Sequence, residues 1–404
     1  MIYLDNNATT RPYGEVIEAI SDCLLNNWQN PSAIYSSAKS AREAVEEARV
    51  HVASLVGADA DEIIFTSGGT EATNTVLNTW IHGEDPALEN RNIRNNYGAS
   101  CPVLVTLTTE HPATLKALES GRKRGKCGTM HVEVDNEGRP LLDVWEEAVS
   151  EATGATFCLA NNETGVISPV SQLVEACRKY GVPVHVDAVQ AVGKLPVNFH
   201  EMNVDYASLS AHKIHGPKGI GAIYCRRGMY LEPLIAGGGQ EGGHRSGTTN
   251  VPGIIGFGVA ARIMTLALEE RRAYMTRLRD KFEAVLLSEL SGVKVNGAGA
   301  PRLSNTSNLT FDGCSSEGLL LLLGMDGICC SVASACKAGT NTPSSVLTAM
   351  GLDPELAKSS LRFSLSSQTT EEEIDMALVS IIHAVNALRS VQSPYTGPVT
   401  VYKP

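Results

Sequence analysis

Short apolar runs alternate with longer amphipathic stretches through the first half of the chain and somewhat beyond. The apolar runs predict strands at residues 61–67, 103–108, 130–134, 155–160, 182–187, 206–210 and 220–225. Apolar positions at helical spacing predict helices at residues 13–25, 37–56, 70–78, 113–124, 142–152 and 170–180. Strands separated by helices of this length indicate an α/β fold with a mostly parallel central sheet and helices on both faces.

The pattern changes after a glycine-rich loop at 237–249. A long helical pattern runs over 252–290, followed by strands at 305–311, 328–332 and 360–365 and helices at 317–323, 343–350 and 371–388. This order predicts a smaller α+β C-terminal domain. We therefore expect four parts: an N-terminal segment (1–14) that packs with the small domain, a large domain (15–258), the small domain (259–392) and a C-terminal tail (393–404).

Composition narrows the class of protein. A chain of 404 residues with 43% apolar residues has material for about two domains. Its formal net charge of −11 argues against DNA binding. No run approaches the eighteen apolar residues of a membrane span, and the first residues show no secretory pattern. The ten cysteines are scattered without a Cys-x-x-Cys pair, which is typical of reduced thiols, so we expect a cytoplasmic protein.

A lysine at a strand end is the first candidate for chemistry. Lys213 lies in Ser-Ala-His-Lys-Ile-His-Gly-Pro-Lys, directly after the predicted strand 206–210. A partly buried amine there has a lowered pKa and can form a Schiff base. Taken alone, the stretch is more typical of a lysine on a surface loop.

Other strand ends supply complementary groups. Gly69 and Thr70 open a helix, where amides can bind a phosphate. Asp187 ends a strand, although it could equally cap a helix, and Gln190 follows it. The remaining strand-end candidates are His111, Asn162, Ser210 and His212. Together with Lys213, this set meets the requirements of pyridoxal 5'-phosphate: a lysine for its aldehyde, an acid for its pyridine nitrogen and a phosphate site.

With these motifs in view, the chain resembles the cysteine desulfurases, a class V aminotransferase group among the fold type I pyridoxal-phosphate enzymes. The resemblance extends from Tyr3-Leu-Asp-Asn-Asn-Ala-Thr to Leu361-Arg-Phe-Ser-Leu and covers most of the chain. Its most specific motifs are Thr-Ser-Gly-Gly-Thr-Glu, Asn-Asn-Glu-Thr-Gly, His-Val-Asp-Ala-Val-Gln, Ser-Ala-His-Lys-Ile-His-Gly-Pro-Lys-Gly, Arg-Ser-Gly-Thr and Ser-Ala-Cys-Lys. The fold it implies is that of a fold type I transferase, with residues 15–258 binding the cofactor.

The resemblance implies a role for each candidate. Lys213 would bind the cofactor covalently, with Asp187 at the pyridine nitrogen, Gln190 at the phenolic oxygen and His111 stacked on the ring as an acid/base. The phosphate ligands would be Gly69, Thr70, Ser210 and His212, with Thr248 reaching the phosphate from the other subunit of a homodimer. Asn162 and Arg362 would hold the substrate carboxylate, Arg362 by a two-pronged contact.

Cys336 is the second half of the expected chemistry. It lies in a stretch of small residues without helical or strand pattern, which predicts a loop in the small domain. By the resemblance, its thiolate, favoured by Lys337, takes sulfur from L-cysteine as a persulfide and leaves L-alanine. The loop length resembles the subgroup that passes sulfur to iron–sulfur scaffold proteins or to RNA thiolation. For a cysteine without this context, burial as a small apolar residue is the commoner reading.

Several alternatives stay open at this level. The same fold also serves selenocysteine lyases and aminotransferases, and a non-catalytic scaffold partner could retain it. Cys336 could also be shared with an iron–sulfur cluster; no other metal site is expected. Gly242 and His244 depart from the family pattern, as does the stretch 366–368. The adjacent Cys329 and Cys330 are either packed in a strand, which we favour, or a relay of thiols.

Overall fold

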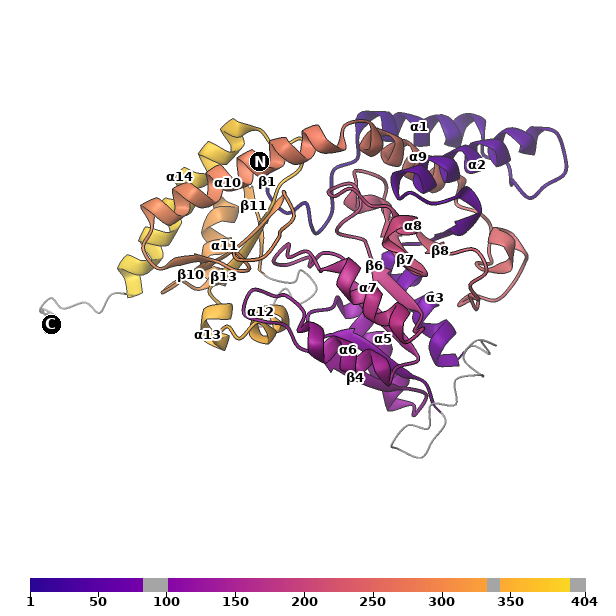
Figure 1. Ribbon diagram of the computed structural model, residues 1–404. Coiled ribbons are helices and arrows are strands. Elements are labelled where there is room, and N and C mark those ends of the chain that lie inside the picture. Colours follow the sequence, from indigo (N-terminus) through magenta and orange to yellow (C-terminus); the bar gives the residue numbers. More distant parts are fainter. Residues whose placement is uncertain (83–100, 333–341, 393–404) are drawn as a thin grey trace, which may run out of the picture.

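The computed structural model describes residues 1–82, 101–332 and 342–392. A seven-stranded sheet lies at its centre (Figure 1). β8 is antiparallel to both of its neighbours and the other neighbouring pairs are parallel, so the predicted mostly parallel sheet is confirmed. In spatial order the strands are β2 (Ile63–Thr66), β8 (Gly221–Cys225), β7 (Tyr206–Ser210), β6 (Val184–Asp187), β5 (Gly154–Cys158), β3 (Val103–Leu107) and β4 (Gly128–Val132).

The strands bury side chains on both faces of this sheet. Along β7, Ala207 and Leu209 belong to one hydrophobic cluster, whereas Tyr206 belongs to a second one on the opposite face. The first cluster includes side chains of α1 (Gly14–Asn26), α2 (Ser37–Leu55), α6 (Leu142–Ser150), α7 (Val170–Lys179) and α9 (Val251–Leu266). The second includes side chains of α3 (Gly69–His82) and α5 (Pro112–Lys123). Helices therefore cover both faces, as predicted.

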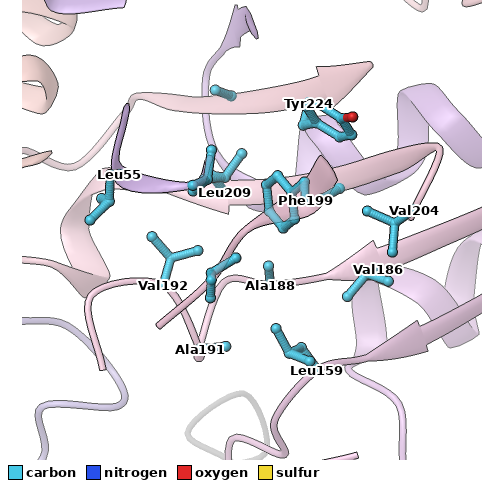
Figure 2. Close-up of a cluster of buried hydrophobic side chains, with 14 of the residues drawn as sticks. Leu55, Leu159, Val186, Ala188, Ala191, Val192, Phe199, Val204, Leu209 and Tyr224 are labelled. Atoms are coloured by element: carbon cyan, nitrogen blue, oxygen red, sulfur yellow. The ribbon is translucent and has the colours of Figure 1, made fainter. Parts of the chain in front are cut away.

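The first hydrophobic cluster packs against the carboxyl ends of β6 and β7. Figure 2 shows Val186, Ala188 and Leu209 packed with Phe199, which belongs to α8 (Phe199–Met202). The rings of Phe199 and Tyr224 are 4.9 Å apart between centroids, and both side chains are completely buried. The carboxyl ends of β6 and β7 are consequently held by a close-packed interior.

The helical pattern over 252–290 is confirmed as helix but not as one helix. α9 ends at Leu266, and α10 (Leu268–Glu289) leaves it at an angle of 76°. Ala267 between them has φ −146° and ψ 33°, which interrupts the helical backbone. α9 packs on α1 and α2, whereas α10 packs on α14, so the two halves serve different layers. In the described part of the chain, no single helix could span a membrane, and this pair meets the length and hydropathy criteria only when its bent halves are combined.

A second, smaller sheet follows these helices and is antiparallel throughout. Its order is β12 (Ser331–Val332), β13 (Ser360–Ser364), β10 (Thr306–Phe311) and β9 (Val293–Val295). α10, α11 (Ser316–Met325) and α14 (Glu371–Gln392) contribute to its own hydrophobic cluster. The short helices α12 (Ser345–Ala349) and α13 (Pro354–Ala357) complete this part (Figure 1). The domain boundaries given above stay a prediction.

The N-terminal residues join this second part although they are remote in sequence. β1 (Ile2–Tyr3) pairs in parallel with β11 (Ile328–Cys329), and Asp5 forms a bridge with Ser364. Ile2 and Leu4 are buried in the cluster of the second sheet. The strand expected over 328–332 is thus divided between two sheets, because β11 pairs with β1 and β12 with β13.

The contact between α2 and α9 gives a test of this packing. A Cβ added at Gly258 would lie 2.5 Å from both Cα and Cβ of Ala48, so a helix backbone would have to move. We expect Gly258→Ala to lower the free energy of unfolding by about 1–3 kcal/mol in chemical denaturation. Gly14→Ala is the matched control, because no atom lies within 4 Å of its added Cβ. Equal stability of the two variants would contradict the close α2–α9 contact.

Candidate active site

The carboxyl ends of β3, β5, β6 and β7 meet at one edge of the central sheet. These strands are parallel, so the residues that follow them face a common crevice. The segments concerned contain His111, Asn162, Asp187, Ser210 and Lys213. The candidates identified at strand ends are therefore brought to one edge.

Lys213 ends a short 3₁₀ turn directly after β7. Its Nζ donates hydrogen bonds to two backbone carbonyl oxygens, those of Asn7 and of Ala8, the second at 2.8 Å. The amine is thus held at the crevice by the N-terminal segment.

Asp187 is the last residue of β6, and 8% of its surface is exposed. Its Oδ1 accepts a hydrogen bond from the Val189 N–H at 3.0 Å. Burial raises the pKa of this carboxyl, while the charges of His111 and Lys213 act in the opposite direction. The acid, the imidazole and the amine therefore interact electrostatically across the crevice.

His111 caps the N-terminus of α5. Its Nδ1 accepts the Ala113 N–H at 3.1 Å, so the proton of the neutral ring lies on Nε2. Burial lowers the pKa of the imidazole, the charge of Asp187 opposes this shift in part, and Lys213 adds to it. The cap fixes both the tautomer and the ring position.

Three of the phosphate candidates, Gly69, Thr70 and Ser210, lie at the start of α3, and His212 lies beside Thr9. A Cβ added at Gly69 would lie 2.6 Å from Cγ2 of Val189, so this position leaves room for no side chain. Ser210 lies close to the same point, and Thr70 is exposed in the first helical turn. His212 Nδ1 lies 3.2 Å from Oγ1 of Thr9, and burial lowers the pKa of this histidine to about 4.

Arg362 lies on β13, in the second sheet, yet reaches the same region. Its Nη2 donates to Oδ1 of Asp5 at 2.6 Å and its Nη1 to the backbone oxygen of Asn162 at 3.1 Å. The side chain is 2% exposed, and its Nε has no hydrogen-bond partner in the described residues. The two expected carboxylate-binding residues are therefore in contact, and Asp5 is a partner that the sequence did not indicate.

Asn7 connects these groups, although in the sequence it is one residue of a polar cluster. It is 1% exposed. Its N–H groups donate to Ser364 Oγ, Thr306 Oγ1 and the Asn162 oxygen. Its oxygens accept hydrogen bonds from Gln190, Lys194, Lys213 and Asn305. One buried residue thus joins the N-terminal segment to both sheets.

Glu110 and Lys194 are two further buried groups that sequence reasoning missed. Glu110 Oε1 accepts the Cys158 N–H at 2.7 Å, whereas its buried Oε2 has no hydrogen-bond partner in the described chain. Burial raises the pKa of this carboxyl to about 8, and Asp187 adds to the effect. Both residues lie in segments that follow predicted strands. Polar residues are common in such loops, so the local sequence did not distinguish these two.

Some candidate residues lie apart from this crevice or outside the described residues. Thr248 is exposed and lines a cavity with Ser67 and Arg245. Cys336 and Lys337 lie outside the described residues. Gly242 has φ +64°, a region that favours glycine. Cys330 contacts the cluster of the second sheet, and burial raises its pKa to about 12, which supports packing rather than a relay.

Known proteins are similar to this chain in sequence and in fold. The chain matches the Aminotransferase class-V family over residues 2–377. It is 41% identical over 396 residues to a cysteine desulfurase of Trichormus azollae, spanning 98% of this chain and 95% of that protein. A solved NifS-like protein has a TM-score of 0.84 at 35% identity, covering 96% and 99% of the two chains. SspA, solved in complex with cysteine, has a TM-score of 0.77 at 31% identity, covering 92% and 100%.

The state of Glu110 can be tested by the pH dependence of stability. Its pKa is raised from 4.5 to about 8, so the folded protein binds the proton more tightly than the unfolded chain does. The stabilisation from this group is full below pH 4.5 and is lost as pH rises toward 8. Glutamine mimics the protonated carboxyl. In urea unfolding, we expect the stability of Glu110→Gln relative to the parent to rise with pH over this window, with a limiting slope of about 1.4 kcal/mol per pH unit.

A difference between parent and variant that does not change between pH 5 and pH 8 would show that Glu110 is ionised in the folded protein. The exposed Glu133, substituted by glutamine, is the control, and its difference from the parent should be independent of pH in this range.

Proposed function

Because the chain belongs to the aminotransferase class-V family and, within it, to the cysteine desulfurases, we propose that it converts L-cysteine to L-alanine and collects the sulfur as a persulfide on Cys336. One observation carries the proposal: Lys213, Asp187 and His111 interact at the crevice, and Asn7 connects Lys213 to the Arg362 region. No described member of this set has been lost, which disfavours a non-catalytic scaffold. The relative of Trichormus azollae is a cysteine desulfurase, which favours this activity over that of an aminotransferase or a selenocysteine lyase.

The residues at the crevice fit pyridoxal 5'-phosphate, the cofactor of this family. Lys213 would hold it covalently, and Asp187 would pair with its pyridine nitrogen. The position of Gly69, which a Cβ would close against Val189, suits a phosphate that approaches the backbone closely. The other phosphate ligands would be Thr70, Ser210 and His212. When bound, the cofactor withdraws electrons from the carbon atoms of an attached amino acid and weakens the bond between its Cβ and its sulfur.

Arg362 would bind the carboxylate of L-cysteine together with Asn162. The guanidinium is buried and anchored by Asp5 and the Asn162 oxygen, so it is oriented before substrate arrives. Its Nε, without a partner in the described residues, is available to a carboxylate oxygen. His111 is neutral with its proton on Nε2, so this nitrogen can donate a hydrogen bond. It would act as a general acid in its imidazolium form, which requires Nδ1 to exchange the Ala113 N–H for a proton.

Cys336 would remove the sulfur. Its thiolate attacks the sulfur of the substrate, the new S–S bond forms, and the Cβ–S bond breaks with its electron pair left on the substrate. A proton then reaches that carbon, so L-cysteine and the Cys336 thiol give L-alanine and a Cys336 persulfide. No oxidant is consumed.

The described residues on either side of the Cys336 segment support this role. Ser331 pairs with Arg362 in the ladder of β12 and β13. On the other side, Ser344 Oγ hydrogen-bonds to Glu163, the neighbour of Asn162. The chain therefore leaves and re-enters its described part beside the two residues proposed to bind the substrate carboxylate.

We further propose a cytoplasmic homodimer in which Thr248 reaches the phosphate of the other subunit. The exposure of Thr248, which leaves its side chain accessible to a second subunit, supports this arrangement. Several large apolar side chains on α1 and the following segment are also exposed, among them Leu25 at 75% and Trp28 at 71%. The sulfur would pass to an acceptor protein, such as an iron–sulfur scaffold, or to RNA thiolation.

Substitution of Lys213 tests cofactor attachment. We expect Lys213→Ala to lose the visible absorbance of the lysine-bound cofactor and to lower desulfuration at least about a thousand-fold, because the covalent attachment is gone. Absorbance spectra of the purified protein and alanine formation from L-cysteine measure the two effects. Lys126→Ala, at an exposed lysine, should behave as the parent. Retained visible absorbance in Lys213→Ala would refute the assignment.

Substitution of Cys336 separates cofactor binding from sulfur transfer. Cys336→Ser should keep the cofactor absorbance and lose sulfide release from L-cysteine by at least about a hundred-fold, because a hydroxyl is a poor nucleophile toward sulfur. The control is Cys330→Ala, which should retain activity if that thiol only packs. Full activity of Cys336→Ser would instead exclude this cysteine as the sulfur carrier.

A further inference from the structure

A second lysine is buried beside the proposed cofactor lysine. Lys194 lies in the connection between β6 and α8, and 5% of its surface is exposed. Its Nζ donates hydrogen bonds to Gln190 Oε1 at 2.7 Å and to Asn7 Oδ1 at 3.1 Å. Both acceptors are amide oxygens rather than carboxylates.

The surroundings of Lys194 make its burial unfavourable. Burial lowers the pKa of the amine well below its ordinary value, and the charges of Lys213 and Arg362 lower it further. The charged and titratable groups around the two lysines are Asp187, His111, His212, His215, Arg271 and Arg362. Burial of this amine near other cations costs free energy. Its hydrogen bonds to Gln190 and Asn7 offset part of that cost.

The two contacts of Gln190 determine which way its amide points. Lys194 Nζ donates to the oxygen, Oε1. A backbone carbonyl can only accept, so the atom 3.0 Å from the Asn7 oxygen is the nitrogen, Nε2. That same Asn7 oxygen accepts a hydrogen bond from Lys213. The amide nitrogen of Gln190 is therefore presented on the side of Lys213.

We propose that Lys194 is a positioning residue that holds the Gln190 amide with its nitrogen toward the cofactor, where it donates to the phenolic oxygen. This inference rests on the proposed function, because it requires a pyridoxal ring on Lys213. Lys194 does not touch the reacting atoms. It acts through Gln190 and thereby adjusts how readily the lysine-bound cofactor loses its proton.

The division of donors between Gln190 and Asn7 supports this role. Asn305 Nδ2 also donates to Asn7 Oδ1, at 3.0 Å, so Asn7 keeps a partner without Lys194. For Gln190 Oε1, no donor besides Lys194 is found in residues 1–82, 101–332 and 342–392. Loss of Lys194 leaves the Gln190 amide held only by the hydrogen bond from Nε2 to the Asn7 oxygen, so its orientation is less restricted and its donation to the phenolic oxygen is weakened.

The test is the pH titration of the visible absorbance of the lysine-bound cofactor. A donor to the phenolic oxygen stabilises its anionic form, which weakens the hold on the neighbouring proton of the Schiff-base nitrogen. Loss of the donor therefore raises the pH midpoint. We expect Lys194→Met to raise it by about one pH unit. An unmoved or lowered midpoint overturns the proposal.

A double-mutant cycle shows whether the effect passes through Gln190. We expect Gln190→Ala to raise the midpoint by a similar amount, and Lys194→Met to add little in the Gln190→Ala background. A full additional shift in that background overturns the positioning role. Asn305→Ala is the matched control, because it removes the other donor to Asn7 but leaves Gln190 held, and its midpoint should equal that of the parent.

A second variant and a measurement on the parent protein distinguish failure of this proposal from failure of the proposed function. If Lys194→Met does not fold, Lys194→Ala gives the same comparison without a donor at this position, and an unmoved midpoint there overturns the proposal equally. If the parent protein reconstituted with pyridoxal 5'-phosphate shows no visible absorbance of a lysine-bound cofactor, the proposed function fails and this inference fails with it.

Discussion

The hydrogen bonds of Asn7 are the constraint on which the rest of the site depends. This single buried residue binds Ser364 of the second sheet, the Asn162 oxygen of the central sheet's edge and the amine of Lys213. A buried polar group without its partners is costly, so the arrangement is favourable only when all parts are in place together. The position of Lys213 is thereby linked to the docking of the N-terminal segment and of the second sheet.

The electrostatics of the crevice follow from the same burial. Asp187 and Glu110 have raised pKa values and Lys194 a lowered one, each chiefly because burial penalises the charged form. A bound phosphate ester with a basic ring nitrogen brings charges of the kinds that such groups can pair with. A cluster of buried groups with shifted pKa values is therefore typical of a site that binds a charged ligand.

The proposed substrate contact lies between the two sheets. Arg362 belongs to β13, its partner Asp5 to the N-terminal segment, and Asn162 to the loop after β5. The segment containing Cys336 joins residues that flank this contact, because Ser331 pairs with Arg362 and Ser344 binds Glu163. The proposed steps of substrate binding and sulfur removal would thus both occur at the junction of the two parts, while the proposed cofactor site lies at the edge of the central sheet.

The sequence by itself determined the strands of the central sheet, its parallel character and the chemical candidates at its edge. Those features are local: apolar runs specify strands, and Lys213, Asp187 and His111 follow directly after them. It did not reveal the break at Ala267, where an ordinary helix-forming residue is bent because α9 and α10 pack on different layers. Nor did it reveal Asn7, Asp5 or Lys194 as site residues. Their partners are up to 357 positions away, and such contacts exist only once tertiary packing buries polar groups that must then pair with one another.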